Sequence, residues 1–427
     1  MIDAPNAELR AARKRMRLVA DDLGGLREFG PMLAIVNPPR WELGHVGWFQ
    51  EYWCLRRTGA GRYTEARGDP ILPNADALYN SAVVPHDARW SLPLPAFDAT
   101  LQYRDSVLER VLERISQSRD DDDLYFARLA SRHEDMHAEA FHYTRQTLGY
   151  PAPAITGHPH PPGAPASGDA ECGGGQFPLG ADHGAGFVFD NEKWSHPVLV
   201  RPFRIARAAV TNGQFREFVE AGGYRNAGFW SPQGRIWLDS ARQSAPAFWR
   251  RADGAWQVRR FDSWVALAED DPVVHVNFHE AEAYCRFAGR RLPTESEWEH
   301  AATWDPREGR KRAFPWGDGP WQPDLANIEN AALAGVHAYP GGDSPCGVRQ
   351  MIGNVWEWTA TPFLPYPGFL RDPYKEYSEP WFGTHRVLRG GCFATSRRIA
   401  CSGYRNFFTP DRSDVFAGFR TCAIDRP

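Results

Sequence analysis

Apolar residues recur at helical spacing along the first 150 positions of the chain. Four stretches carry this pattern, at residues 7–23, 41–57, 98–117 and 122–149. Each of them predicts an amphipathic α-helix. A single long connection separates the second stretch from the third. Four helices joined in this way predict a four-helix bundle over residues 1–150.

The composition and the hydrophobic pattern of the chain change twice after this helical region. Residues 151–176 are dominated by Pro and Gly and predict a linker. From residue 177 onward, short apolar runs alternate with Gly, Pro, Asn and Asp, and helical patches interrupt them at 211–222, 278–289 and 295–303. This pattern predicts one α+β domain over residues 177–427 with much irregular chain. We therefore expect a multidomain fold, a helical bundle followed by an α+β domain.

Composition narrows the classes of function. The 427 residues are 24% charged and 42% hydrophobic, as in folded soluble proteins. A net charge of -4 gives no basic field for nucleic acid. No run of 18 apolar residues and no signal peptide is evident, so we expect a cytoplasmic protein without a membrane partner. The seven cysteines are odd in number and lack a CxxC, which favours reduced thiols over disulfides or a thiolate zinc site.

Histidines on two predicted helices form a candidate metal site. His133 and His137 are four residues apart and therefore lie on one helical face. His45 lies in an otherwise apolar stretch of the second predicted helix, where an unpartnered imidazole is costly. If the two helices face each other, the three imidazoles can bind one metal. Zinc, iron and copper all accept such ligands, but a three-histidine face with open positions suits iron(II) chemistry with O2. Glu51 and Glu139 are candidates to orient the ligand rings, or are surface charges.

Two other interpretations of these histidines exist. An i, i+4 pair by itself is more often a satisfied helical pair than a metal site. His133-Glu134-x-x-His137 also matches the zinc-protease pattern, with Glu134 as the general base. The protease interpretation is disfavoured because the predicted setting is a helical bundle and not a protease cleft.

Several motifs together carry a family resemblance that covers nearly the whole chain. The first 150 residues resemble the DinB-like bundle of the ergothioneine-type synthases. The region after residue 177 resembles the formylglycine-generating-enzyme-like domain, which has a C-type-lectin-like fold. The motifs are His45-x-x-Trp48-Phe49-x-Glu51, His133-x-x-x-His137-x-Glu139, RLPTESEWE at 291–299, GNVWEW at 353–358, RGG at 389–391 and GFR at 418–420.

This resemblance implies a non-heme iron(II) enzyme that uses O2 to join a chalcogen to the imidazole C2 of hercynine, the trimethylated form of histidine. By resemblance, His45, His133 and His137 are the iron ligands. The α+β domain is expected to complete the substrate pocket. Asn406 would contact the carboxylate or imidazole of hercynine, and Phe407 its ammonium group.

Three positions depart from the pattern of the sulfur-type enzymes. Met136 stands where a substrate-contacting glutamine is common. Phe408 stands where an aspartate helps to hold the amino end of the thiol donor. Arg89 has no close second arginine in the loop that binds the donor carboxylates. Because paired charges recognise a zwitterionic donor, their loss suits a neutral, sugar-like donor.

The variant motifs WELGHVGWFQEYW at 41–53 and RNFFTPDRSDVFAGFRTC at 405–422 resemble the selenoneine synthase branch. The first hypothesis is therefore carbon–selenium bond formation between a selenosugar and hercynine. The alternative is a carbon–sulfur bond-forming sulfoxide synthase of ergothioneine biosynthesis, with a cysteine-type thiol as donor. Arg412 is a further candidate for the donor or a carboxylate, and Tyr366 is the candidate for the proton-donating tyrosine that such enzymes carry past the GNVWEW motif.

Other classes stay open. DinB-like bundles also carry zinc sites in thiol transferases and hydrolases, and formylglycine-type domains also serve as binding modules. Formylglycine-generating enzyme itself is disfavoured because Cys392 and Cys401 do not have the expected offsets from RGG. Asn327 and Asn354 could help a structural calcium site, although turn-forming asparagines are the simpler interpretation. We expect a monomer or a small homo-oligomer.

Overall fold

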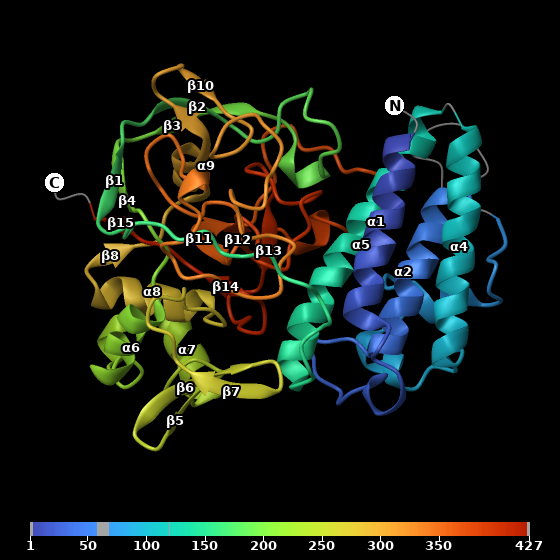
Figure 1. Ribbon diagram of the computed structural model, residues 1–427, viewed down its shortest axis with the longest axis horizontal. Helices are drawn as coiled ribbons and strands as arrows, with labels where there is room; N and C mark the ends of the chain where they lie inside the picture. The colour runs from blue at the N-terminus through green and yellow to red at the C-terminus, as the bar shows by residue number, and fades with distance from the viewer. Residues whose placement is uncertain (1–2, 58–67, 119, 425–427) are drawn as a thin grey trace. The chain divides into compact units, whose positions relative to one another are not determined.

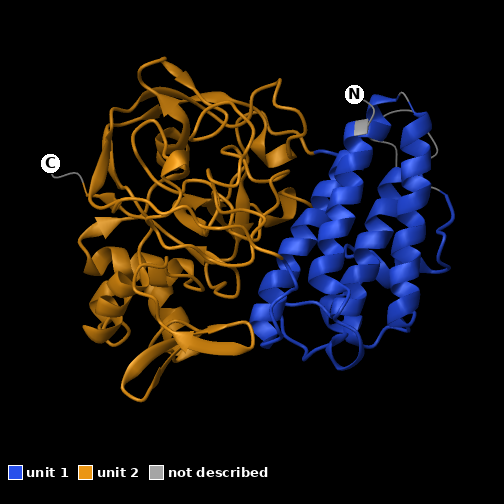
Figure 2. Cartoon of the chain, in the orientation of Figure 1, with its two compact units in different colours: residues 1–155, 372–376 blue, residues 156–371, 377–427 orange. Residues whose placement is uncertain are grey.

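The computed structural model describes residues 3–57, 68–118 and 120–424. The chain divides into two compact units (Figure 2). The helical unit comprises residues 1–155 and 372–376, and the mixed unit comprises residues 156–371 and 377–427. The division falls inside the stretch predicted to be a linker.

In the described part of the helical unit, four long helices pack side by side (Figure 1). Their buried faces form a core that includes Met16, Leu43, Val46 and Phe141. The helices are α1 (Asp3–Ala20), α2 (Pro39–Cys54), α4 (Phe97–Gln117) and α5 (Asp121–Leu148), with the short α3 (Ala75–Tyr79), η1 (Gly25–Arg27) and η2 (His86–Trp90) between them.

Local sequence sets the ends of these helices. Pro39 occupies the first turn of α2, where a backbone N–H would have no acceptor within the helix, so proline is tolerated there. The Asp120 carboxylate caps α5 by accepting a hydrogen bond from the N–H of Asp122. Gly149 ends α5 with a φ of 65°, a left-handed conformation that glycine adopts without penalty. The two histidine-bearing helices, α2 and α5, are thus delimited by their own sequence.

The mixed unit is built from short strands and short helices, so the predicted fold class is confirmed. Strand β1 begins at Asp169, inside the stretch that we expected to be linker. In the described residues the strands form sheets in the orders β1-β4-β15-β8, β13-β12-β11-β14, β5-β6-β7, β2-β3 and β10-β9. The bounds are β1 (Asp169–Cys172), β2 (Gly175–Leu179), β3 (His196–Val200), β4 (Phe203–Ala206), β5 (Trp249–Ala252), β6 (Ala255–Arg260), β7 (Ser263–Ala266), β8 (Arg290–Arg291), β9 (Trp304–Asp305), β10 (Arg310–Lys311), β11 (Trp356–Pro362), β12 (Arg386–Arg389), β13 (Asn406–Phe408), β14 (Ala417–Gly418) and β15 (Cys422–Ala423).

The helices of the mixed unit begin at sequence-encoded caps. Thr211, Asn277 and Thr294 each form a capping box with the residue three positions later. The helices are α6 (Asn212–Glu220), α7 (Pro232–Ala241), α8 (Phe278–Phe287) and α9 (Glu295–Thr303), with η3 (Asp190–Glu192), η4 (Ala227–Phe229), η5 (Pro340–Gly342) and η6 (Glu379–Trp381).

The motifs of the mixed unit meet in its core. Arg389 of the RGG motif is buried and pairs with Glu295 at 3.0 Å and with Glu299, both on α9. Glu357 of GNVWEW accepts hydrogen bonds from the Trp298 indole at 2.8 Å and from Arg420 of GFR at 2.6 Å. Buried charges persist only when paired in this way. These motif residues therefore hold the scaffold of the mixed unit together.

The asparagines considered for calcium lie in a buried amide network. Asn327 Nδ2 donates to Asn354 Oδ1 at 2.9 Å, and Asn354 Nδ2 donates to the carbonyl oxygen of Ala334 at 2.8 Å. Asn354 has a φ of 66°, in the left-handed region that asparagine tolerates in turns. Both observations agree with a turn-forming role.

Among the described residues, no helix has both the length and the apolar character needed to cross a membrane.

A candidate metal centre in the helical unit

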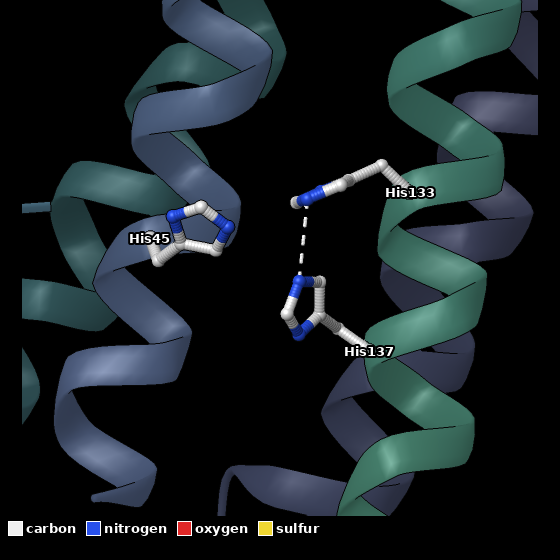
Figure 3. Close-up of side chains that lie close together, drawn as sticks. All are labelled: His45, His133 and His137. Atoms are coloured by element: carbon white, nitrogen blue, oxygen red, sulfur yellow. Dashed lines mark hydrogen bonds between the residues drawn. The ribbon is translucent and has the colours of Figure 1, made fainter. Parts of the chain in front are cut away.

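Three histidines from two helices converge in the helical unit (Figure 3). His45 projects from α2, and His133 and His137 project from α5, one turn apart. The possible ligand atoms of the three side chains all lie within 4.8 Å of one another. The Nε2 atoms of His133 and His137 are 3.2 Å apart. The structure thus brings together the three residues that the sequence suggested as ligands.

A backbone carbonyl fixes the ring of His45. Its Nδ1 lies 2.8 Å from the carbonyl oxygen of Tyr79. Because a carbonyl only accepts, Nδ1 carries the proton and Nε2 keeps its lone pair. The ring also stacks on Trp41, with centroids 5.0 Å apart. Burial and the nearby His137 lower the pKa of His45 to about 3, so the ring stays neutral and available as a ligand.

A buried carboxylate fixes the ring of His137. Nδ1 of His137 lies 2.6 Å from Glu42 Oε1, and the Glu42 side chain is 2% exposed. The contact places the proton on Nδ1 and leaves Nε2 facing His133. Glu51, a residue that we expected to orient a ligand ring, instead accepts hydrogen bonds from the Tyr103 hydroxyl at 2.6 Å and from the Ile71 N–H at 2.8 Å.

Glu42 was not identified from the sequence. Its signal is an acidic residue one turn before His45, on a helix most of whose residues are buried. Its partner, however, lies on another helix and emerges only from the packing of α2 against α5. The same carboxylate accepts a hydrogen bond at 3.3 Å from Asn37 Nδ2, which further fixes its position.

The ring of His133 is held by stacking. It lies parallel to Phe49 with centroids 3.6 Å apart and an interplanar angle of 4°. Burial and the two neighbouring imidazoles hold the pKa of His133 well below its usual range. Its Nδ1 is buried and has no hydrogen-bond partner among the described residues.

The geometry and chemistry of this cluster fit a metal ion. The three imidazoles bring nitrogen atoms to one point, and burial lowers the pKa of two of them, His45 and His133, which leaves their lone pairs available to a metal. Such a donor set suits the divalent transition metals of intermediate softness. Three protein ligands also leave coordination positions open, as in catalytic metal sites.

A tyrosine from far along the chain joins the site. Residues 372–376 belong to the helical unit, and Tyr374 among them packs edge-on against Phe49 at 4.9 Å. Its ring centroid is 6.1 Å from that of His133. Burial raises the pKa of the Tyr374 phenol, which keeps it protonated. No spacing rule in the sequence pointed to Tyr374.

Tyr366, the tyrosine suggested from the sequence, belongs to the core of the mixed unit. Its hydroxyl donates to Glu295 at 3.2 Å, and the Arg405 guanidinium lies 4.0 Å from its ring centroid. Packing in the core and the contacts with Glu295 and Arg405 are sufficient to explain why Tyr366 is buried.

Two other predicted residues lie in the helical unit. Arg89 on η2 stacks over Trp41 at 4.0 Å and donates to Asn37 Oδ1 at 2.6 Å. Since Trp41 stacks on His45, Arg89 is one side chain away from the cluster. Met136 is half-buried on α5 and directly precedes His137.

The remaining predicted residues lie on or near β13 of the mixed unit. Phe407 stacks on Phe363 at 4.1 Å and meets Tyr377 edge-on at 5.8 Å. Asn406 Oδ1 accepts a hydrogen bond from the Phe407 N–H. Three half-buried positions, Asn406, Phe407 and Phe408, therefore present a largely aromatic strand.

Arg412 is already paired within the mixed unit. Its guanidinium donates two hydrogen bonds to Asp414, at 2.5 and 2.6 Å, and lies 4.9 Å from the ring centroid of Phe408. Asp414 is buried, so this bidentate pair neutralises the arginine.

Comparison with known families agrees with the two units. Residues 7–143 match the DinB superfamily, and residues 166–425 match the sulfatase-modifying factor enzyme 1-like domain. A formylglycine-generating enzyme of Streptomyces coelicolor is 36% identical over 318 residues, which cover 64% of this chain and 95% of that protein. That similarity leaves about a third of this chain without a counterpart.

Other relatives match the chain along almost its whole length. A hercynine oxygenase of Mycolicibacterium thermoresistibile is 38% identical over 426 residues, covering 96% of this chain and 92% of that protein. A hercynine oxygenase of Mycolicibacterium smegmatis is 39% identical, covering 97% of each chain. Such identity over both units, together with the three-histidine cluster, confirms the prediction of an enzyme. The chain belongs to the hercynine oxygenase family.

Proposed function

We propose that the protein is an O2-dependent iron(II) enzyme that joins a chalcogen to the imidazole C2 of hercynine. The observation that carries this proposal is the cluster of His45, His133 and His137 in a chain that matches hercynine oxygenases over both units. Bound iron would supply the activation of O2 and the binding of the chalcogen donor through its open positions.

The residues around the histidines have distinct tasks in this proposal. Glu42 and the carbonyl group of Tyr79 hold the protons on Nδ1 of His137 and His45, so that the Nε2 atoms of both rings would be free to bind a metal. The stacked rings of Trp41 and Phe49 keep the ligands in place and exclude water.

A tyrosine supplies the proton in this proposal. Tyr374 is favoured over Tyr366 because its ring lies beside His133, whereas the Tyr366 hydroxyl donates to Glu295 in the core of the mixed unit. A raised pKa keeps the Tyr374 phenol protonated, so its Oη can deliver a proton on the His133 side of the site.

Aromatic residues of the mixed unit suit the ammonium group of hercynine. A quaternary ammonium cannot donate hydrogen bonds and is held best by aromatic faces. Phe407 with Phe363 and Tyr377 offers such faces. Because Asn406 Oδ1 is occupied by the backbone, its Nδ2 remains to donate to the carboxylate or imidazole of the substrate.

For the donor, we propose a selenosugar, which makes the reaction carbon–selenium bond formation and places the enzyme in selenoneine biosynthesis. The support comes from this chain's own residues. Phe408 offers no carboxylate to an amino group, and the charge of Arg412 is neutralised by Asp414. Arg89 is the remaining arginine among the predicted donor-binding residues. A neutral donor fits these residues better than a zwitterionic thiol.

Carbon–sulfur bond formation in ergothioneine biosynthesis is the second candidate. The comparisons favour it more directly, since the full-length relatives are named hercynine oxygenases and share 37–39% of their residues with this chain. Both candidates share the acceptor, the metal and O2, and differ only in the donor.

A competition experiment separates the two candidates. The purified protein is loaded anaerobically with Fe(II), given hercynine, a selenosugar and γ-glutamylcysteine together, exposed to O2, and analysed by mass spectrometry. A selenium adduct of hercynine as the main product supports the selenosugar donor, and a sulfoxide adduct supports the second candidate. No adduct with either donor contradicts the shared proposal. His133→Ala should abolish product, whereas the exposed His183→Ala should not.

A further inference from the structure

Two cysteines far apart in sequence bring their sulfur atoms together in the mixed unit. The Sγ atoms of Cys172 and Cys346 are 3.4 Å apart, although the residues are 174 positions apart in the chain. Cys172 ends strand β1, and its backbone is fixed by pairing with Phe203 of β4. Cys346 lies in a tight turn in which the N–H of Gly347 donates to the carbonyl oxygen of Ser344 at 2.8 Å. Both thiols are therefore held in place by local backbone structure.

The two thiols differ in their surroundings. Cys172 is 5% exposed, within the core of the unit, whereas Cys346 is half-buried and packs against that core. The Ser344 hydroxyl lies 3.4 Å from the Cys346 sulfur. Arg207 is held beside the same turn by donating to the Gly347 carbonyl oxygen at 2.8 Å. The Ser344 hydroxyl and the Arg207 guanidinium favour a thiolate at Cys346, against a hydrogen bond that the Cys346 thiol donates to the Ala301 carbonyl oxygen at 3.1 Å.

These differences assign different roles to the two sulfurs. The contact with Cys172, the Ser344 hydroxyl and the charge of Arg207 together lower the pKa of Cys346 below its usual value. The hydrogen bond with Cys346 and burial raise the pKa of Cys172. A half-buried cysteine with a lowered pKa, in contact with a buried cysteine whose pKa is raised, is the arrangement of a reactive cysteine with a resolving partner.

We propose that Cys346 and Cys172 form a thiol-oxidation site that closes to a reversible disulfide when the protein meets a hydroperoxide. The Cys346 thiolate attacks a peroxide oxygen, which breaks the O–O bond and gives a sulfenic acid and hydroxide. The Cys172 sulfur then attacks the sulfenic sulfur, loses its proton, and displaces hydroxide, which leaves as water. In total two thiols lose two electrons, and one hydrogen peroxide becomes two waters.

Little movement is needed for this reaction. A disulfide bond is about 2.05 Å long, so side-chain rotation of the two residues must close the remaining gap. The bond would tie the end of β1 to the 344–347 turn. Because it closes a very long loop, it restricts the unfolded chain strongly and should raise the melting temperature of the protein by roughly 5 °C or more.

Peptide mapping of the full-length protein tests the proposal. The protein is treated with hydrogen peroxide, alkylated without reduction, digested and analysed by mass spectrometry. We expect a linked pair of peptides that contain Cys172 and Cys346, a fall from seven titratable thiols to five, and recovery of all thiols with dithiothreitol. A peptide map that lacks this link after other cysteines have oxidised would overturn the proposal.

Variants separate the two roles. Cys172→Ala should leave a sulfenic acid at Cys346 that dimedone traps, and Cys346→Ala should abolish both the trapping and the link. Cys401→Ala is the matched control, since Cys401 is also half-buried but burial raises its thiol pKa to about 12. The control should oxidise as the parent protein does. Equal loss of Cys401 and Cys346 in the parent protein would show that the pair has no special reactivity.

Discussion

Replacement of Glu42 tests how the metal centre is organised. Glu42 Oε1 accepts a hydrogen bond from His137 Nδ1 at 2.6 Å in an environment where the carboxylate is 2% exposed. A carboxylate in this position makes the imidazole a stronger ligand and fixes its tautomer. We therefore expect Glu42→Ala to weaken metal binding without removing any ligand.

The size of the effect follows from the type of contact. Removal of a group that orients a metal-bound histidine costs about 10- to 100-fold in metal affinity, or about 1.4–2.7 kcal/mol. Glu42→Gln retains an acceptor for the Nδ1–H but loses the negative charge. Since charge-assisted hydrogen bonds are about twice as strong as neutral ones, its loss should be near the lower end of that range.

The assay is an anaerobic titration of Fe(II) against a chelator of known affinity. Glu51→Gln is the matched control, since Glu51 is equally buried on the same helix but bonds to Tyr103 and Ile71. We expect it to lower the melting temperature and to leave the iron dissociation constant unchanged. An unchanged dissociation constant in Glu42→Ala, or an equal loss in Glu51→Gln, would refute the reasoning.

Three further predictions follow from other parts of the structure. Burial raises the pKa of the Glu192 carboxyl from 4.5 to about 8. The stability that the protonated carboxyl contributes is therefore fully present below pH 4.5 and is lost as the pH rises through 8. Glu192→Gln should raise the melting temperature much more at pH 8.5 than at pH 5, and equal shifts at the two pH values would refute the assignment. Phe407→Ala should raise the KM for hercynine roughly 5- to 30-fold through loss of an aromatic face, while iron affinity stays unchanged. Histidine lacks the trimethylammonium group, so its inhibition constant as a competitor of hercynine should change less. Tyr374→Phe should lower kcat with iron binding retained, whereas Tyr366→Phe should mainly lower the melting temperature; the opposite pattern in steady-state kinetics and thermal unfolding would return the proton-donating role to Tyr366.

Local sequence patterns predicted much of the helical unit. The periodicity of residues 98–117 corresponds to α4 (Phe97–Gln117), and that of residues 122–149 corresponds to α5 (Asp121–Leu148). The i, i+4 spacing of His133 and His137 is a property of one helix, so it could be identified without the fold. The place of His45 depended on two helices facing each other, which the bundle provides.

The parts that the sequence did not reveal depend on long-range packing. Glu42 meets His137 only because α2 packs on α5, and Tyr374 joins the helical unit from a segment that follows most of the mixed unit. No periodicity or cap encodes such contacts. The motifs raised a different difficulty, since Arg389 and Glu357 are characteristic of the family yet are buried in scaffold ion pairs. A motif can therefore identify a family without marking its active site.

We propose that His45, His133 and His137 hold an iron ion used for O2 chemistry on hercynine. The most direct test is O2 uptake by the anaerobically Fe(II)-loaded protein, measured with hercynine and each donor singly and together. We expect about one iron per chain and uptake that requires both hercynine and a donor, with neither iron nor uptake in His133→Ala. A protein that binds zinc in place of iron and consumes no O2 under any of these conditions would overturn the proposed iron chemistry and favour a thiol transferase or hydrolase.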